Sequence, residues 1–312
     1  MNIVFFGSAK FGYPSLKKLI DSGYDIPLVV TQPDKLKGRG MKPGGTEIKE
    51  LALQSGLKIF QPADINSPES VESLKAAKAD LFVIIAYGQK FSKEVLDIPL
   101  IMPVNVHASL LPKYRGAAPI SRAIINGDSE TGNSIMKVIP KMDAGPVICR
   151  SRMPILDEDD ALTIENKLSQ DAAVLLLDAV KMLESGQFKL QDQDERGVSI
   201  AGKLDSGTAR IKWDAPADRI NNLVRGCVNW SAAFTLYKGK VLKIYKSAAA
   251  PAENATGGTR PGDIISVSGS GILVSAGSGA LSLRELQLEG KKRLEAKEFL
   301  RGNNIRPGEK LV

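Results

Sequence analysis

The sequence predicts an α/β protein with two domains. A Rossmann-like N-terminal domain with a mostly parallel sheet is followed by a small, OB-like C-terminal β-barrel. Three observations lead to this prediction. Apolar runs alternate with helical stretches through the first half, short strands with glycine-rich turns fill the last third, and 312 residues exceed one ordinary core.

The first half reads as buried strands separated by helices. Residues 2–7, 26–33 and 80–88 contain runs of consecutive apolar residues rather than an alternating pattern, as is typical of parallel strands covered on both faces. A shorter strand is expected within 57–62. Helical spacing occupies the stretches between the strands, at 11–23, at 47–56 and near 67–78. This alternation predicts helical crossovers between parallel strands.

Beyond residue 130 the pattern changes. Two strands are expected within 133–140 and 145–155, around a turn that contains Asp143. A long helix over 159–186 follows, with acidic residues at its start and a glycine at its end. A polar stretch comes next, then a short helix near 214–226 and short strands over 257–287. We therefore expect one domain at 1–188, a linker at 189–205 and a second domain at 206–312.

Composition excludes several classes of protein. The chain is 43% hydrophobic and 25% charged, and no apolar run approaches the roughly 20 residues of a membrane-spanning helix. The N-terminal residues have neither the basic leader nor the cleavage site of a signal peptide. With only Cys149, Cys227 and a single histidine, neither a disulfide framework nor a His/Cys zinc site is expected. We expect a cytoplasmic protein without a metal.

The positive charge is confined to one part of the chain. Residues 1–200 carry 24 Lys and Arg against 25 Asp and Glu, whereas residues 201–312 carry 18 against 10, a net charge of +8. Such an excess is expected of a domain that contacts a polyanion. A basic surface that only keeps the protein soluble would give the same excess.

A dinucleotide site is not expected after the first strand. Gly7 and Gly12 lie in the segment GSAKFG, which lacks the middle glycine of the fingerprint. The second strand ends in Thr31 and Gln32 rather than in the acidic residue that would bind a ribose.

The only histidine, His107, is a candidate catalytic residue. It ends a predicted strand, which is where open α/β sheets bind ligands, and Asn105 lies two residues earlier on the same side of that strand. Asp143 lies in the expected turn KMDAGP. An amide can donate to an oxyanion, and a carboxylate favours the protonated imidazole. The three residues suit acyl transfer. A hydrolase that uses Ser109 as nucleophile is the weaker alternative, because Ser109 is not in a glycine-flanked nucleophile elbow.

Two segments resemble the signature of the folate-dependent formyltransferases: NVHASLLPKYRGAAPI at 105–120 and MDAGPVI at 142–148. Within that superfamily the chain resembles the methionyl-tRNA formyltransferases from end to end. The supporting stretches are TQPDKLKGRG (31–40), VIIAYGQ (83–89), AGKLDSGTARIKW (201–213) and the tail 286–312.

The resemblance implies transfer of a formyl group from 10-formyltetrahydrofolate to the α-amino group of methionyl initiator tRNA, without a metal. Asn105, His107 and Asp143 fall on the catalytic trio of the family. Two segments fall on its folate-binding regions: Ile85, Ala86, Tyr87 and Gly88, which act largely through backbone groups, and Ser109, Leu110, Leu111 and Pro112.

The resemblance also implies where charged initiator methionyl-tRNA binds. Glycines and prolines predict a mobile loop for TQPDKLKGRGMKPGG, whose basic residues are Lys35, Lys37, Arg39 and Lys42. Arg39 falls on the arginine that is essential in the family. We expect phosphate contacts from Lys291, Lys292 and Arg293 in the second domain, and tRNA binding also by Lys203 in the expected linker. A monomer is expected.

Two segments depart from the family pattern. GGTEIK follows the basic loop where a Ser/Thr-Pro-Val-Lys type of sequence is common, and VNWSAAFT at 228–235 replaces an Asn-Pro-Trp-Pro type of turn. Neither departure touches the catalytic trio.

Other functions remain open at this point. An amino-sugar nucleotide N-formyltransferase shares the catalytic motif and a second domain, and a formyltetrahydrofolate hydrolase uses the same three residues. A glycinamide ribonucleotide formyltransferase is disfavoured, because proteins of that class end near residue 200 and lack the second domain. An RNA-binding protein without catalysis would explain the charge but not the two signature segments. The GRG loop, the AYG segment and the basic second domain favour tRNA.

Overall fold

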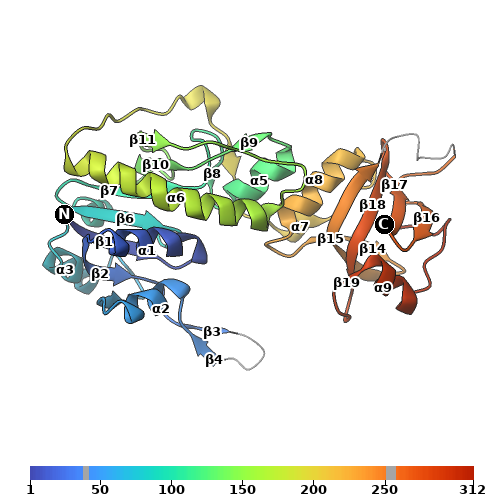
Figure 1. Cartoon of the computed structure of the whole chain (residues 1–312), viewed down its shortest axis with the longest axis horizontal. Coiled ribbons are helices and arrows are strands. Elements are labelled where there is room, and N and C mark those ends of the chain that lie inside the picture. Colours follow the sequence, from blue (N-terminus) through green and yellow to red (C-terminus); the bar gives the residue numbers. More distant parts are fainter. Residues whose placement is uncertain (38–41, 251–257) are drawn as a thin grey trace. The chain divides into compact units, whose positions relative to one another are not determined.

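The structure is a computed structural model of the chain, and it describes residues 1–37, 42–250 and 258–312. The described residues form two compact units (Figure 1). The first unit contains residues 1–116, 130–153 and 165–201, and the second contains 117–129, 154–164 and 202–312.

The first unit is built on a seven-stranded sheet. From one edge to the other its strands are β11 (Val147–Arg150), β10 (Ser134–Lys137), β7 (Met102–His107), β6 (Leu81–Ile85), β1 (Asn2–Gly7), β2 (Asp25–Val30) and β5 (Ile59–Phe60). Strands β5, β2, β1, β6 and β7 are parallel, whereas β10 and β11 are antiparallel to their neighbours. The mostly parallel sheet predicted from the apolar runs is therefore confirmed.

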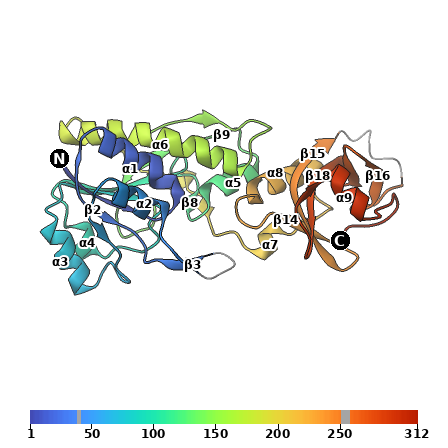
Figure 2. The ribbon, with the colours of Figure 1, turned by 60° about the horizontal axis from the view of Figure 1, so that its bottom comes forward.

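Helices cover this sheet because its strands are apolar on both faces. The helices are η1 (Lys10–Gly12), α1 (Tyr13–Asp21), α2 (Glu47–Gln54), α3 (Pro68–Ala76), α4 (Lys93–Leu96), α6 (Ala161–Glu184) and η2 (Glu195–Gly197). Helix α6 lies beside α1 in both ribbon views (Figures 1 and 2), and the hydroxyl of Ser169 donates to the carbonyl of Phe11 at 2.8 Å. Phe6 and Phe82 are fully buried, with ring centroids 4.9 Å apart.

The second unit contains an antiparallel sheet in the order β14 (Ala233–Tyr237), β15 (Lys240–Ala250), β18 (Ala280–Leu288), β17 (Gly271–Ser275) and β16 (Ile264–Ser268), with β19 (Leu294–Glu295) paired to β18. The C-terminal residues join its two edges. Leu236 and Val312 exchange backbone hydrogen bonds on one side, and Leu311 donates to Gly262 on the other. The sheet is thereby closed, as the predicted small barrel requires.

Short helices complete the second unit. They are α5 (Pro119–Asn126), α7 (Ser206–Ala209), α8 (Ala217–Cys227) and α9 (Ala296–Gly302). Helix α8 packs on both α5 and β15, and it buries Ile220 and Val224. Helix α5 was not expected from the sequence. It belongs to the second unit although it lies between strands of the first.

Two expectations differ from the structure. The basic segment was expected to be a mobile loop rather than a helix, but within it β3 (Lys35–Lys37) and β4 (Lys42–Gly44) pair as short antiparallel strands. The polar stretch expected as a linker packs within the first unit up to residue 201. Its backbone pairs there with Val147 and, through β13 (Ile200–Ala201), with β8 (Arg115–Gly116).

The remaining short strands are β9 (Glu130–Thr131) and β12 (Met153–Pro154).

Candidate active site

The candidate site lies at the carboxyl ends of adjacent parallel strands. The chain reverses its direction of progress across the sheet between β1 and β6, and β7 follows next to β6. Ligands of open α/β sheets bind at such a switch point. His107 ends β7, and the segment 85–88 leaves the end of β6 beside it.

His107 is 6% exposed and its ring is fixed by a backbone carbonyl. Nε2 lies 2.9 Å from the carbonyl oxygen of Tyr114. Because a carbonyl can only accept, Nε2 carries a proton and donates it to Tyr114. Nδ1 lies 3.7 Å from Oδ2 of Asp143. The structure thus brings together the histidine and the aspartate that the sequence could not show to be neighbours.

Asp143 reaches His107 from a tight turn with a positive φ of 49°. Its Oδ2 accepts a hydrogen bond from the backbone N–H of Gly116 at 2.8 Å. The glycine that closely follows it, Gly145, has no room for a side chain, because a Cβ there would lie 1.8 Å from the carbonyl oxygen of Lys137. This close approach between backbones is the physical reason for the glycine in MDAGP.

Asn105 has a free amide beside this pair. It pairs with Met136 on β10 while His107 pairs with Ser134, so both side chains lie on one face of β7. Asn105 is half-buried, and its side chain forms no hydrogen bond with the residues that the structure describes. The amide is therefore available to a bound molecule.

Ser109 does not resemble a nucleophile. It is 1% exposed, and its hydroxyl donates to the carbonyl oxygen of Lys113 at 2.7 Å rather than to His107. Since Nε2 of His107 is committed to Tyr114, the arrangement of a Ser–His–Asp hydrolase is not present.

The loop that follows His107 is held by hydrogen bonds to β10 and β11. The hydroxyl of Ser134 donates to the carbonyl of Ser109 and accepts from the N–H of Leu111. Leu111 is buried, Leu110 and Pro112 are half-buried, and the Leu111–Pro112 peptide bond is cis. These residues are therefore well fixed, and their contact with folate stays a prediction.

The segment 85–88 exposes backbone and buries side chains. Ile85 and Tyr87 are buried, whereas Ala86 and Gly88 are exposed with positive φ angles of 47° and 94°. The ring of Tyr87 packs against Phe6, and burial raises the pKa of its hydroxyl. The Ser8 hydroxyl donates to the Tyr87 carbonyl at 3.3 Å and so joins the ends of β1 and β6. The two exposed residues have small side chains, and the backbone role expected of this segment stays a prediction.

The basic residues expected to bind tRNA differ in how they are held. Arg39 lies outside the described residues, as do the side chains of Lys35, Lys37 and Lys42. Lys203, Lys291 and Lys292 are exposed. Arg293 forms two hydrogen bonds with Glu285, at 2.6 and 2.7 Å, and lies over the ring of Tyr245 at 4.1 Å. The charge of Arg293 is thus already partnered.

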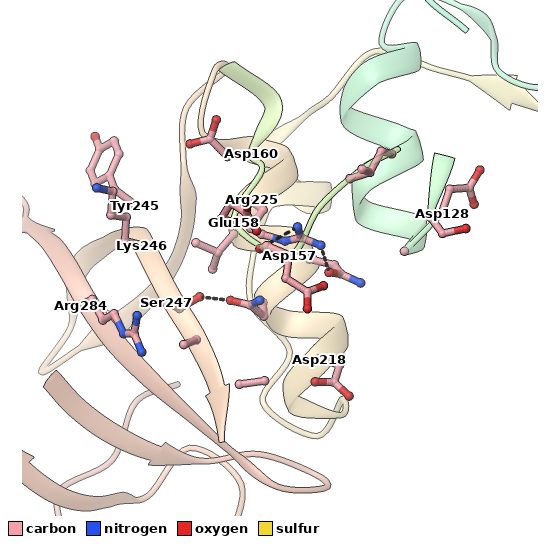
Figure 3. A pocket seen from close by; sticks show the side chains of 18 residues that line it. Asp128, Asp157, Glu158, Asp160, Asp218, Arg225, Tyr245, Lys246, Ser247 and Arg284 are labelled. Carbon is pink, nitrogen blue, oxygen red and sulfur yellow. Dashed lines mark hydrogen bonds between the residues drawn. The ribbon is translucent and has the colours of Figure 1, made fainter. Parts of the chain in front are cut away.

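A hollow of about 830 Å³ lies within the second unit (Figure 3). The segment before α6 and helix α8 contribute carboxylates to it, including Asp157, Glu158 and Asp218. Strands β15 and β18 contribute Lys246 and Arg284. Five carboxylates and three basic side chains line the hollow, so the basic excess of this domain is not concentrated here.

Neither a metal site nor a membrane-spanning helix is found among residues 1–37, 42–250 and 258–312. No group of three or more His, Cys, Asp and Glu side chains is arranged to hold a metal ion within them. In the same residues, no helix combines the length and apolar character needed to cross a membrane.

Sequence reasoning missed several residues around His107. Ser199 accepts from the N–H of Tyr114, whose carbonyl faces His107. Gln193 donates to the carbonyl of Asp143 and accepts from Arg115. The polar composition of 187–199 gave no signal for this, because it is equally typical of a linker.

Two family profiles match the chain. One, described as formyl transferase, covers residues 1–180, and the other, described as formyl transferase C-terminal domain, covers residues 203–304. Methionyl-tRNA formyltransferase of Caldanaerobacter subterraneus subsp. tengcongensis is 41% identical over 309 residues, which is 99% of each chain. The enzyme of the same name from Alkaliphilus metalliredigens is 40% identical over 99% of this chain and 97% of its own.

A solved structure shares the fold. WlaRD, a sugar 3-N-formyltransferase crystallised with dTDP and 5-N-formyl-tetrahydrofolate, matches 94% of this chain and 99% of its own with a TM-score of 0.68. Its sequence identity is only 17%, so the likeness extends to the fold alone.

Proposed function

This chain belongs to the methionyl-tRNA formyltransferase family, and we propose that it transfers the formyl group of 10-formyltetrahydrofolate to methionyl initiator tRNA. The acceptor is the α-amino group of the esterified methionine, and the product serves translation initiation in the cytoplasm. The first unit carries the folate and the chemistry, the second holds the tRNA, and the enzyme acts as a monomer.

The observation that carries the proposal is the arrangement around His107. Its Nε2 proton is committed to a carbonyl, its Nδ1 faces Asp143, and the amide of Asn105 is free on the same face of β7. No side chain in this arrangement is placed to attack a substrate. The residues present instead stabilise charge, as direct transfer to an external amine requires.

The reaction begins with attack of the neutral amine on the formyl carbon. An α-amino group has a pKa of about 7.7–8.0, so it needs little activation. A bond forms between its nitrogen and the formyl carbon, and the carbonyl electron pair moves to oxygen. The resulting oxyanion is the costly species, and we assign its stabilisation to the amide of Asn105 and to the proton on Nδ1 of His107.

Asp143 completes the site by stabilising the charged imidazole. At 3.7 Å its Oδ2 is beyond hydrogen-bond distance of Nδ1, so the Nδ1 proton is not taken up by the carboxylate and can be shared with a reacting oxygen. Collapse of the intermediate breaks the bond from the formyl carbon to the folate nitrogen. That nitrogen takes up a proton, and the amine loses one, giving tetrahydrofolate and formylated methionyl-tRNA.

The structure of the 85–88 segment supports a folate-derived donor. Flat heterocycles with donors and acceptors on one edge are recognised by peptide groups, and the exposed residues Ala86 and Gly88 follow the end of β6, which pairs with β7. Among the relatives reported above, the sugar formyltransferase was crystallised with 5-N-formyl-tetrahydrofolate.

The proposal is tested by tetrahydrofolate release from 10-formyltetrahydrofolate, with charged initiator tRNA, with uncharged tRNA or with an amino-sugar nucleotide. Release should require the charged tRNA and should be severely weakened in Arg39→Ala. Arg39→Lys is the matched variant, since lysine keeps the positive charge but cannot form the bidentate hydrogen bonds of a guanidinium. Release of tetrahydrofolate without any acceptor would show that the enzyme is a hydrolase. Release only with the amino-sugar nucleotide would confirm formyl transfer but contradict tRNA as the acceptor.

A further inference from the structure

The buried amide of Gln193 contacts the turn that carries Asp143. Gln193 is 9% exposed and lies in the stretch whose composition predicts a linker. Its Nε2 donates to the carbonyl oxygen of Asp143 at 2.8 Å and to that of Gly145 at 2.7 Å. Both amide protons are therefore used on two carbonyls of a single turn.

The orientation of this amide is fixed from its other side. Nε of Arg115 donates to Oε1 of Gln193 at 3.0 Å, and Arg115 is itself 3% exposed. Because an arginine can only donate, the amide cannot rotate to exchange its oxygen and nitrogen. Arg115 is held in turn by Glu195, at 3.1 Å from its terminal nitrogen.

The turn needs such support. Asp143 adopts a left-handed conformation that non-glycine residues keep only where the surrounding structure holds them in it. The N–H of Gly116 holds one oxygen of its carboxylate, and the amide of Gln193 holds the backbone of the turn from which that carboxylate reaches His107. A displacement of about 1 Å at a reacting centre can lower a rate by on the order of 10²-fold.

We propose that Gln193 is a positioning residue for the formyl transfer. Its amide holds the two carbonyls of the turn, and the turn holds the Asp143 carboxylate toward His107. Gln193 touches no reacting atom in this account, and Arg115 sets its orientation. The inference rests on the proposed function, since the rate it affects is that of formyl transfer.

The test is Gln193→Glu, compared with Gln191→Glu on the same segment. Glutamate keeps the length and the partner of Arg115, but it presents an oxygen to two carbonyl oxygens. Gln191 contacts Arg150 rather than the turn, so the control adds the same charge two residues away. We expect kcat to fall by on the order of 10–10² in Gln193→Glu, with KM for folate and tRNA unchanged and Gln191→Glu near wild type.

A double-mutant cycle separates positioning from general damage. In an Asp143→Ala background there is no carboxylate left to position, so Gln193→Glu should cause almost no further loss of the single-turnover rate. The same fold loss in both backgrounds would overturn the proposal, as would wild-type kcat in Gln193→Glu or an equal loss in Gln191→Glu.

Gln193→Met guards against failure to fold. It keeps the side-chain length without adding charge, and it should show a smaller loss of kcat in the same direction; wild-type kcat in this variant would also overturn the proposal. If the wild-type enzyme itself transferred no formyl group to any acceptor, the proposed function would fail instead, which distinguishes the two.

Discussion

The His107 site and the basic residues of the second unit differ in how firmly the fold holds them. The nitrogens of His107 face the Tyr114 carbonyl and the Asp143 carboxylate. Gly116 and Gln193 hold Asp143 in turn, and Ser199 accepts from the N–H of Tyr114. Lys291 and Lys292, by contrast, are exposed at a hairpin tip. The difference indicates that the chemistry depends on exact distances, whereas phosphate contacts tolerate movable charges.

Removing the charge of Asp143 should have the largest effect. Asp143→Asn keeps the size of the side chain and an acceptor for Gly116, but it no longer stabilises a charged imidazole. We expect kcat to fall by on the order of 10²–10⁴ at unchanged KM for tRNA, measured by steady-state formylation. Asp192→Asn, an exposed neighbour of Gln193, serves as the control. Wild-type kcat in Asp143→Asn would show that the carboxylate has no part in the chemistry.

Crowding the turn should have the next largest effect. In Gly145→Ala the new Cβ would lie 1.8 Å from the Lys137 carbonyl, so the turn must move. We expect a loss of about 1–3 kcal/mol in the free energy of unfolding, together with reduced kcat. In the control Gly202→Ala the Cβ meets no atom within 4 Å. Denaturant melts and initial rates measure both, and equal behaviour of the two variants would remove the steric argument.

The exposed lysines should contribute to binding but not to rate. The double variant Lys291→Ala with Lys292→Ala should reduce the slope of log affinity for tRNA against log salt by about 2, with kcat at saturating tRNA unchanged. Lys58 and Lys78 precede strands at the opposite end of the parallel sheet and provide the control pair. A slope that stays the same would place the tRNA elsewhere on the second domain.

A small effect is expected from the carboxylate of Glu309, in the segment that closes the barrel. The hydrogen bond from Lys238, followed by those from Tyr237 and the N–H of Arg306, lowers its pKa from 4.5 to about 2. Because the folded pKa is the lower one, the stabilisation is present above pH 4.5 and is lost as the pH falls toward 2. Glu309→Gln should therefore lower Tm slightly at neutral pH, and the difference should vanish near pH 2. A constant difference across that range would contradict this assignment.

Features that depend on neighbouring residues could be predicted from the sequence, whereas contacts between residues far apart in the chain could not. The apolar strands and the position of His107 at a strand end follow from neighbouring residues, and the structure confirms the sheet they predict. The hydrogen bond between Gln193 and Arg115 joins residues 78 apart, and no periodicity reports such a contact. Helix α5 joins the second unit for a similar reason, because its packing partner α8 lies about a hundred residues later.

The most direct test of the difference between the two regions is to compare His107→Ala with the wild type at saturating charged tRNA. Single-turnover formylation and the Kd for tRNA are measured on the same preparations. We predict that the rate of the chemical step falls by on the order of 10²–10⁴ while Kd stays the same. An unchanged rate, or a loss accounted for entirely by weaker tRNA binding, would contradict the assignment of the chemistry to His107.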